Sequence, residues 1–205
     1  MDATDEVAAE DLLRRVRMGN QAAFGLLLER YRNYLTVLAR LQIGRRLQRK
    51  FDPADVVQET FLQAHSKFSQ FNGRTETELI GWIRQILASR LAKLVRHYWG
   101  TRGRDVRLER ALQEDLDRSS SVLELGLTSR ADSPSAAAAR REQAMVLADA
   151  LERLSDHYRE VILLHEFQDL SFPEVAQRMG RSLDSVKNLW IRALTQLRHV
   201  LGEVP

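Results

Sequence analysis

The side chains that could carry acid–base or metal chemistry are few and scattered along the chain. The five histidines lack the spacing of a metal site, and His165-Glu166 has no second histidine to complete an H-E-x-x-H zinc motif. Asp55 and Glu59 could in principle act as general acid and base, but no nucleophile or apolar pocket is indicated beside them. We therefore expect no catalytic residue, no metal ligand and no cofactor, and we expect that the protein is not an enzyme.

The composition favours long helices. The 205 residues include no cysteine, which excludes disulfides, thiol chemistry and cysteine–zinc sites and agrees with a reducing compartment. Only 10 glycines and 4 prolines interrupt the chain, so a turn-rich all-β fold and glycine-rich phosphate loops are disfavoured. The acidic start has no apolar signal core, and no apolar run is long enough to span a membrane. We predict an all-α fold and a cytoplasmic location.

The charge is unevenly distributed, although the net charge is only +3. Residues 1–11 carry five acidic side chains and no basic one. Residues 81–110 carry eight basic side chains against two acidic ones, and residues 111–135 are acidic again. A basic block beside acidic ones suggests an anionic partner, while a solvated helix face would show the same run of charges. Both interpretations stay open on charge alone.

Apolar residues at helical spacing predict two helical blocks separated by a polar segment. Asp52-Pro53 is typical of an N-cap followed by proline at the first helical position. Residues 118–137 are rich in serine, glycine and proline and lose the apolar periodicity, which predicts a flexible linker. The predicted buried faces before it are Phe24, Leu27, Leu28, Tyr31, Leu35 and Leu38; then Val56, Val57, Thr60, Phe61, Ala64 and Phe68; then Leu79, Trp82, Ile83, Ile86, Leu87, Leu91, Leu94 and Val95.

Residues 171–197 predict a helix-turn-helix. Ser171 and Glu174 have the spacing of a capping box, Gly180 supplies a left-handed turn, and Ser182 can cap the following helix. The small Ala176 allows two helices to cross closely. An ordinary helical hairpin is the alternative, but the polar and basic outer face of the second helix favours DNA binding. That face consists of Ser185, Lys187, Asn188 and Arg192, whereas Val186, Leu189 and Leu194 are predicted to point inward.

Three segments resemble bacterial RNA polymerase sigma-70 factors of the extracytoplasmic-function type. Residues 151–201 resemble region 4, with L-x4-R-E-V-x2-L, L-S-x2-E-x-A, G-x-S-x3-V-K and R-A-x3-L-R in order. Residues 52–68 resemble region 2.2, and residues 82–97 resemble regions 2.3 and 2.4. The resemblance implies two helical domains joined by a flexible linker. The predicted division is an acidic segment at 1–11, region 2 at 12–104, a linker at 105–139 and region 4 at 140–202.

The resemblance also implies the site residues and partners. The partners are promoter DNA and the bacterial RNA polymerase core, including its β subunit and the coiled coil of its β′ subunit; an anti-sigma factor is a further possible partner. The residues expected to bind the core are Asp55, Gln58, Glu59, Leu62 and Gln63. Those expected at the promoter −10 element are Asn72, Gly73, Arg74, Ser89, Lys93, Arg96 and His97. Those expected at the −35 element are Arg181, Ser182, Ser185, Lys187, Asn188 and Arg192.

The function that this pattern favours is that of a sigma factor, which binds core polymerase, directs it to promoters and helps to melt the −10 region. Two alternatives stay open. One is a helix-turn-helix regulator that binds its operator without polymerase and oligomerises through its N-terminal part. The other is a helical adaptor that sequesters polymerase or a sigma factor without contacting DNA, and such an adaptor would not need the basic clusters.

Overall fold

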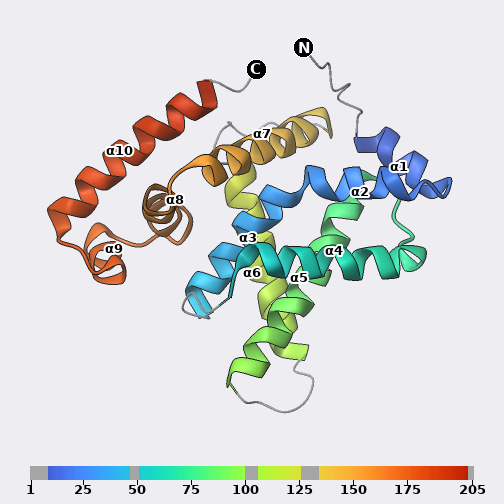
Figure 1. The fold of residues 1–205 in the computed structure, drawn as a ribbon, viewed down its shortest axis with the longest axis horizontal. Coiled ribbons are helices and arrows are strands. Elements are labelled where there is room, and N and C mark those ends of the chain that lie inside the picture. Colours follow the sequence, from blue (N-terminus) through green and yellow to red (C-terminus); the bar gives the residue numbers. More distant parts are fainter. Residues whose placement is uncertain (1–8, 47–50, 100–105, 126–133, 203–205) are drawn as a thin grey trace. The chain divides into compact units, whose positions relative to one another are not determined.

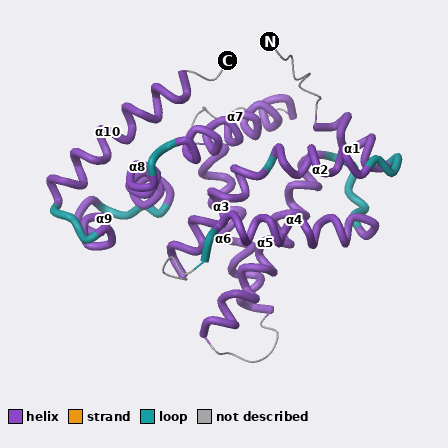
Figure 2. Tube along the Cα trace, viewed as in Figure 1, coloured by secondary structure: helices purple, strands orange, loops and turns teal. Residues whose placement is uncertain are grey.

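The computed structural model describes residues 9–46, 51–99, 106–125 and 134–202, and within these ranges the regular structure is entirely helical (Figures 1 and 2). This confirms the predicted all-α class. The chain divides into two compact units, Met1–Leu116 and Asp117–Pro205. The first unit contains α1 (Ala9–Arg17), α2 (Gln21–Arg30), α3 (Arg32–Arg46), α4 (Pro53–Lys67), the 3-10 turn η1 (Phe68–Gln70), α5 (Glu76–Trp99) and the start of α6 (Val106–Leu125). The second contains the rest of α6, α7 (Pro134–Arg153), α8 (Asp156–Ile162), the π-helical segment η2 (Leu163–Phe167), α9 (Phe172–Met179) and α10 (Leu183–Gly202).

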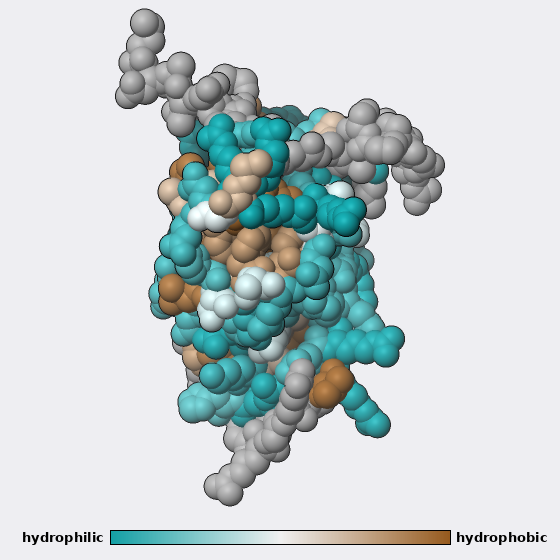
Figure 3. Space-filling view, turned by 90° about the vertical axis from the view of Figure 1, so that its right-hand side faces the viewer, coloured by the Kyte–Doolittle hydropathy of each residue, from teal (hydrophilic) through white to brown (hydrophobic). Residues whose placement is uncertain are grey.

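Large apolar side chains on the surface are dispersed. Met18, Leu26, Leu62, Val106 and Ile191 are each more than half exposed. In the view of Figure 3 the apolar areas are small and are bordered by hydrophilic side chains. None of the described helices is both long and apolar enough to cross a membrane.

One apolar stripe runs through α2 and α3 and forms part of the core of the first unit. Asn20 begins α2, where its side-chain oxygen accepts a hydrogen bond from the backbone N–H of Ala23 at 3.0 Å. The sequence predicts one continuous helix, whereas the structure separates α2 from α3 at Tyr31, whose buried hydroxyl donates to Glu76 Oε1 at 2.5 Å. All six predicted core positions of this stripe are buried: Phe24, Leu27, Leu28, Tyr31, Leu35 and Leu38.

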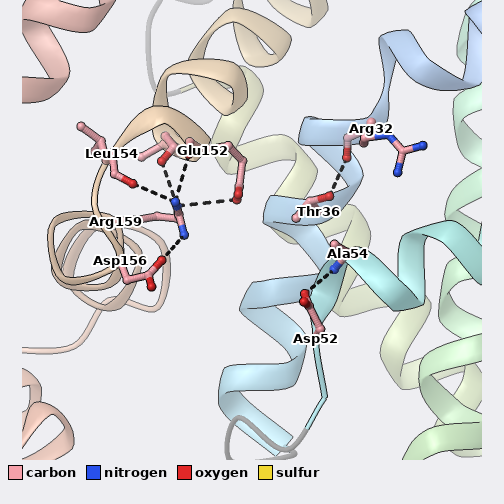
Figure 4. A network of polar contacts seen from close by, with 9 residues as sticks. Arg32, Thr36, Asp52, Ala54, Glu152, Leu154, Asp156 and Arg159 are labelled. Atoms are coloured by element: carbon pink, nitrogen blue, oxygen red, sulfur yellow. Dashed lines mark hydrogen bonds and ion pairs between the residues drawn. The ribbon is translucent and has the colours of Figure 1, made fainter.

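Helix α4 begins as the sequence predicts. The Asp52 carboxylate accepts a hydrogen bond from the Ala54 N–H at 2.9 Å, and proline occupies the first helical position (Figure 4). The helix packs against α3 and α5, and in Figure 1 it crosses α5. Its predicted inner face is buried at Val56, Val57, Thr60, Phe61 and Ala64, while Phe68 at its end is half-buried. The buried Thr60 hydroxyl donates to the Val56 carbonyl at 2.8 Å, so this polar group has a hydrogen-bond partner in the core.

Helix α5 is the long helix that carries the basic block. Its residues Leu79, Ile83, Ile86, Leu87 and Leu91 are buried as predicted. Three other predicted inner positions are half-buried instead: Trp82, Leu94 and Val95. The predicted end of the helix at Gly100 and Gly103 lies outside the described residues.

The flexible linker predicted at 118–137 is wrong for residues 118–125, which belong to α6, and for residues 134–137, which begin α7. Residues 126–133 lie outside the described residues. Leu112, Leu116 and Leu123 recur at helical spacing and are fully buried, so an apolar stripe continues into the serine-rich segment. The serines fit a helix because their hydroxyls find local acceptors: Ser120 bonds Glu124 at 3.1 Å, and Ser121 bonds the Asp117 carbonyl at 2.9 Å. The composition was therefore a weaker signal than the leucine spacing.

A buried arginine closes the end of α7 in the second unit (Figure 4). Arg159 is only 7% exposed, and its guanidinium donates to three carbonyls at the end of α7 and just beyond it: Leu151 at 2.9 Å, Glu152 at 3.0 Å and Leu154 at 2.8 Å. It also pairs with Asp156 at 2.9 Å. The last carbonyls of a helix lack partners within the helix, so one side chain here satisfies several at once. This role of Arg159 was not predicted from the sequence.

The remainder of the second unit packs around α10. Helix α10 contacts α7, α8 and α9, and the π-helical segment η2 contacts α8 and α9. The buried apolar residues of α8, η2, α9 and α10 include Val161, Ile162, Leu163, Leu164, Val175, Ala176, Val186, Ala193, Leu197 and Val200.

Candidate nucleic-acid interface

The turn between α9 and α10 has the local geometry that the sequence predicts. Ser171 donates to the Glu174 carboxylate from its backbone N–H at 2.8 Å and from its hydroxyl at 2.6 Å, within a complete capping box. These hydrogen bonds lower the pKa of Glu174 below its ordinary value, and the bond from the Ser171 hydroxyl has the largest effect. Gly180 ends α9 with φ 63°, and the Ser182 hydroxyl accepts from the Ser185 N–H at 3.3 Å. A capped helix, a left-handed glycine and a second capped helix form the helix-turn-helix.

The outer face of α10 presents the polar side chains expected at DNA. Ser185 is half-buried. Lys187, Asn188 and Arg192 are exposed on α10, and Arg181 and Ser182 are exposed in the turn before it. The inner face differs from the prediction, because Leu189 and Leu194 are only half-buried and flank the buried stripe. That stripe consists of Val186, Ala193, Leu197 and Val200, whose separations of seven, four and three residues follow one side of a helix.

Trp190 of α10 packs against the π-helical segment η2 and bonds to it. Its indole Nε1 donates to Glu166 Oε1 at 2.9 Å, and its ring meets His165 and Phe172 edge-on at 5.6 and 5.5 Å between centroids. His165 stacks on Phe172 at 4.2 Å, and its Nδ1 lies 2.8 Å from the Leu170 carbonyl. The bulky residue on the second helix therefore has an internal role, which sequence spacing alone did not indicate.

A second turn precedes α5 in the first unit and contains Asn72, Gly73 and Arg74. One oxygen of Glu78 accepts from the backbone N–H of Arg74 at 2.7 Å, and from the N–H and hydroxyl of Thr75 at 2.9 and 3.0 Å. The Glu78 N–H returns a bond to the Thr75 hydroxyl at 3.2 Å. The hydrogen bonds that Glu78 accepts lower its pKa, and the bond from the Arg74 N–H has the largest effect. This capping box was not predicted, although the T-x-x-E spacing of Thr75 and Glu78 is its sequence signal.

Aromatic rings support this turn from the inside. Phe71 lies 5.1 Å from Trp82 and 5.9 Å from Phe68, between ring centroids, and Phe68 lies 6.4 Å from Trp82. A Cβ atom at Gly73 would stand 2.5 Å from Phe71 Cε2 and 2.9 Å from Glu78 Cβ, so only glycine fits there. Asn72 and Arg74 are exposed beside this packed glycine.

The basic face of α5 is partly engaged within the first unit. Lys93 and His97 are exposed, and Ser89 is half-buried. Arg96 Nη1 lies 3.3 Å from Glu109 Oε1 at the start of α6, and the two side chains are only 16% and 19% exposed. An arginine that was expected to contact DNA thus already has a carboxylate partner.

The outer face of α4 combines acidic, amide and apolar side chains. Asp55, Gln58, Glu59 and Leu62 are exposed, Leu62 at 63%, and Gln63 is half-buried. Glu59 forms an ion pair with Arg90 of α5, a contact that was not predicted from the sequence. An open hollow is lined by Glu59, Leu62, Gln63 and Arg90, so this surface belongs to α4 and α5 together.

A charged network borders the same surface. Arg32 bonds Glu29 at 2.6 and 2.8 Å and Gln58 at 3.2 Å, and its guanidinium carbon lies 5.1 Å from the centroid of Phe61. The hydrogen bond from Arg32 lowers the pKa of Glu29. Among the described residues, no group of three histidine, aspartate or glutamate side chains could hold a metal ion.

Known proteins resemble this chain both within the helix-turn-helix and along most of its length. Residues 144–197, which contain the helix-turn-helix, match the family described as Sigma-70, region 4. The chain is 26% identical over 190 residues to the ECF RNA polymerase sigma-E factor of Haemophilus influenzae, covering 92% of this chain and 93% of that protein. It is 28% identical over 198 residues to the RNA polymerase sigma factor NccH of Alcaligenes xylosoxydans xylosoxydans, covering 97% of each.

Two solved structures also align along most of the chain. The RsbN–BldN complex contains a chain that is 23% identical, with a TM-score of 0.32, covering 93% of this chain and 99% of that one. The structure of CnrH with the cytosolic domain of CnrY gives 24% identity and a TM-score of 0.33, covering 96% and 99%. Residues 144–197 thus match sigma-70 region 4, and the chain is similar to RNA polymerase sigma factors, including the extracytoplasmic-function (ECF) type, along nearly its whole length.

Proposed function

We propose that this protein is a sigma factor of the extracytoplasmic-function type. It directs bacterial core RNA polymerase to promoters through one DNA contact in each of its two units, and it binds the core through the outer face of α4. The observation that carries the proposal is the exposed polar face of α10. It directly follows the helix-turn-helix turn, inside the segment that matches sigma-70 region 4. The protein acts in this proposal as a non-catalytic polymerase subunit in the cytoplasm.

The −35 element is assigned to α10. The major groove of duplex DNA admits a helix, and amide and cationic side chains on it can bond base edges and phosphates. Asn188 is suited to a base edge, and Lys187 and Arg192 are suited to phosphates or guanine. The remaining members of this contact are Arg181, Ser182 and Ser185, around the turn.

The −10 element is assigned to the turn before α5 and to the outer face of that helix. An extruded base needs hydrogen-bonding groups that reach its edge, and the exposed amide of Asn72 can both donate and accept. Gly73 and Arg74 complete the turn. The face beyond it consists of Ser89, Lys93, Arg96 and His97, which can follow a single-stranded phosphate backbone.

The core interface is assigned to α4. Asp55, Glu59 and exposed Leu62 suit a helical partner that offers basic side chains around an apolar centre, such as the coiled coil of the polymerase β′ subunit. The two flanking amides, Gln58 and Gln63, extend this surface. The β subunit and, as a regulator, an anti-sigma factor are further proposed partners that the family resemblance implies.

The test is runoff transcription with purified core polymerase and the full chain. We expect promoter-dependent transcripts that require both proteins, and weak binding of the free protein to duplex promoter DNA. Specific duplex binding by the free protein without core-dependent transcription would favour a helix-turn-helix regulator instead. Core binding without any DNA dependence would favour an adaptor.

A charge reversal tests the core interface. Because Glu59 already pairs with Arg90, changing it would also release Arg90, so Asp55→Arg alone is the cleaner variant. It should abolish co-purification with core polymerase, since it turns attraction into repulsion. Glu114→Arg makes the same change of charge away from α4, at an exposed position of α6 whose ion-pair partner Arg110 is also exposed, and it should leave co-purification intact. Equal co-purification of both variants would contradict the assignment of α4.

A further inference from the structure

We infer that Glu78 is a positioning residue for the Asn72–Arg74 turn: its carboxylate, together with the ring of Phe71, holds that turn in the shape in which it receives a −10 base. This inference deepens the proposed function and rests on it. The family resemblance identified the turn and the helix that follows, but it assigned no role to Glu78 or Phe71.

The first step is the hydrogen bonding of the Glu78 carboxylate. A single oxygen receives the N–H groups of two consecutive residues, Arg74 at 2.7 Å and Thr75 at 2.9 Å. The bond to Thr75 belongs to the capping box that starts α5, whereas the bond to Arg74 reaches one residue further back into the turn. Hydrogen bonds to an ionised carboxylate are stronger than neutral ones, and they account for the lowered pKa of Glu78. The carboxylate therefore fixes the turn as well as the helix end.

The second step is the packing on the other side of the turn. Phe71 rests against Trp82 at 5.1 Å between centroids and fills the space that a side chain at Gly73 would need. The same hypothetical Cβ would also approach Glu78 Cβ at 2.9 Å. Gly73 is thus enclosed between Phe71 and Glu78, and the backbone of the turn has little room to move.

The third step is what the turn leaves available. Asn72 is exposed and has no hydrogen-bond partner among the residues that the structure describes. Its neighbours on the C-terminal side are held by Glu78, and its neighbour on the N-terminal side is Phe71. An unpaired amide on a fixed backbone is the arrangement that favours base contact, because a flexible turn would lose conformational entropy on binding.

A matched control exists in the second unit. Glu174 accepts from the N–H and hydroxyl of Ser171 in a capping box of the same type, and its pKa is lowered in the same direction. Glu174→Ala therefore removes the same kind of helix cap without touching the turn before α5. A general effect of losing a cap would appear in both variants, and an effect on the turn would appear in Glu78→Ala alone.

The first experiment measures the turn in the free full-length protein. Amide hydrogen exchange of Arg74 and Thr75 should become severalfold faster in Glu78→Ala than in the wild type. Glu174→Ala should leave both rates unchanged, and Glu78→Gln should fall between, since an amide oxygen accepts more weakly than a carboxylate. Unchanged exchange of Arg74 in Glu78→Ala would overturn the inference.

The second experiment measures base choice by the reconstituted holoenzyme on a promoter premelted over the −10 element, with each base of that element replaced in turn. Glu78→Ala and Asn72→Ala should both lose discrimination severalfold, Glu78→Gln should restore part of it, and Glu174→Ala should keep it. Unchanged discrimination in Asn72→Ala would overturn the base-reading role of the turn, and so the proposed function of this site. Lost discrimination in Asn72→Ala with full discrimination in Glu78→Ala would overturn the positioning role of Glu78 alone.

Discussion

The two turns proposed to contact DNA both contain a glycine and both precede a helix, yet the two glycines are required for different physical reasons. Gly180 has φ 63°, and nothing lies within 4 Å of the position where its Cβ would be. Gly73 is not left-handed, but a Cβ there would collide with Phe71 and Glu78. Gly180 is required because its backbone is left-handed, and Gly73 is required because neighbouring side chains leave no room for a Cβ atom. The comparison shows that a glycine turn in the sequence does not reveal which constraint a substitution would violate.

The two surfaces also differ in how far they are engaged within their own units. Before and along α5, Glu78 holds the turn and Glu109 holds Arg96. On α10, Lys187, Asn188 and Arg192 are exposed and have no partner among the described residues. The proposed −35 contact on α10 therefore has cationic groups without a carboxylate partner in the described part of the chain, whereas the proposed −10 contact on α5 includes one arginine that is paired with a carboxylate.

The largest effect is expected from Gly73→Ala, which tests the close approach. The new Cβ must displace the Phe71 ring, and such overpacking lowers the free energy of unfolding by about 1–3 kcal/mol. Open-complex formation should fall with it, because the turn loses its shape. Gly81→Ala in α5 is the control: with open space around its Cβ, it should stabilise the helix by roughly 0.5–1 kcal/mol. Thermal unfolding and permanganate footprinting of the −10 region measure the two quantities. A stable, fully active Gly73→Ala would contradict the constraint.

A smaller effect is expected from Gly180→Ala, which tests the backbone conformation. A left-handed alanine costs about 1–2 kcal/mol, and no steric clash is added. Gly180→Asn should lose less, since asparagine adopts this conformation more readily. Unfolding of the full chain gives the energy, and binding of the holoenzyme to duplex −35 DNA gives the functional result. If alanine and asparagine were equally disruptive, a packing constraint would have to replace the conformational one.

Local signals in the sequence identified much of the fold correctly. The N-cap at Asp52, the capping box at Ser171 and the left-handed Gly180 each depend on residues within four positions, and each is present in the structure. Helical spacing placed the buried stripe of α2 and α3 as well. These features are predictable because one short segment contains both the donor and the acceptor, or all the members of one helix face.

The wrong or missing predictions have two causes. Some sequence signals conflict with one another, and some contacts join residues that lie far apart in the sequence. Serine, glycine and proline outweighed the leucine spacing in the interpretation of α6, although serine hydroxyls can bond within a helix. The pairing of Trp190 with Glu166 joins residues 24 positions apart, and that of Glu59 with Arg90 joins two helices. Such contacts depend on how the helices pack. The sequence therefore predicted which residues form the candidate surfaces, but it did not predict the contacts that those residues make within the protein.

A third prediction tests the engagement of Arg96. Glu109→Gln removes the carboxylate, and since partly exposed ion pairs contribute about 1 kcal/mol or less, binding of the free protein to single-stranded −10 DNA should tighten by no more than severalfold. The gain should shrink as salt rises, because a phosphate contact by arginine is screened. Glu114→Gln on the same helix is the control and should change nothing. Fluorescence anisotropy at two salt concentrations makes the measurement. Unchanged affinity for Glu109→Gln would mean that Arg96 does not contact DNA.

The smallest effect is expected from acidification, and it tests whether the two capping boxes differ in what they hold. Both carboxylates have a pKa below the ordinary value of 4.5, so their ionised forms are favoured in the folded protein. A lowered folded-state pKa means that the stabilisation is complete above 4.5 and is lost as the pH falls through the lower folded-state value. Little change is therefore expected at neutral pH. Both groups are exposed at the surface, so the readout should be local.

Backbone amide shifts of the 15N-labelled protein resolve the two boxes separately. Below pH 4.5, the amide of Ser171 should titrate with Glu174, while the amides of both Arg74 and Thr75 should titrate together with Glu78. Glu78→Gln should abolish the response of Arg74 and Thr75 and leave that of Ser171, and Glu174→Gln should do the reverse. If Thr75 titrates with Glu78 but Arg74 does not, then the carboxylate caps α5 without holding the turn, and the two boxes are equivalent helix caps.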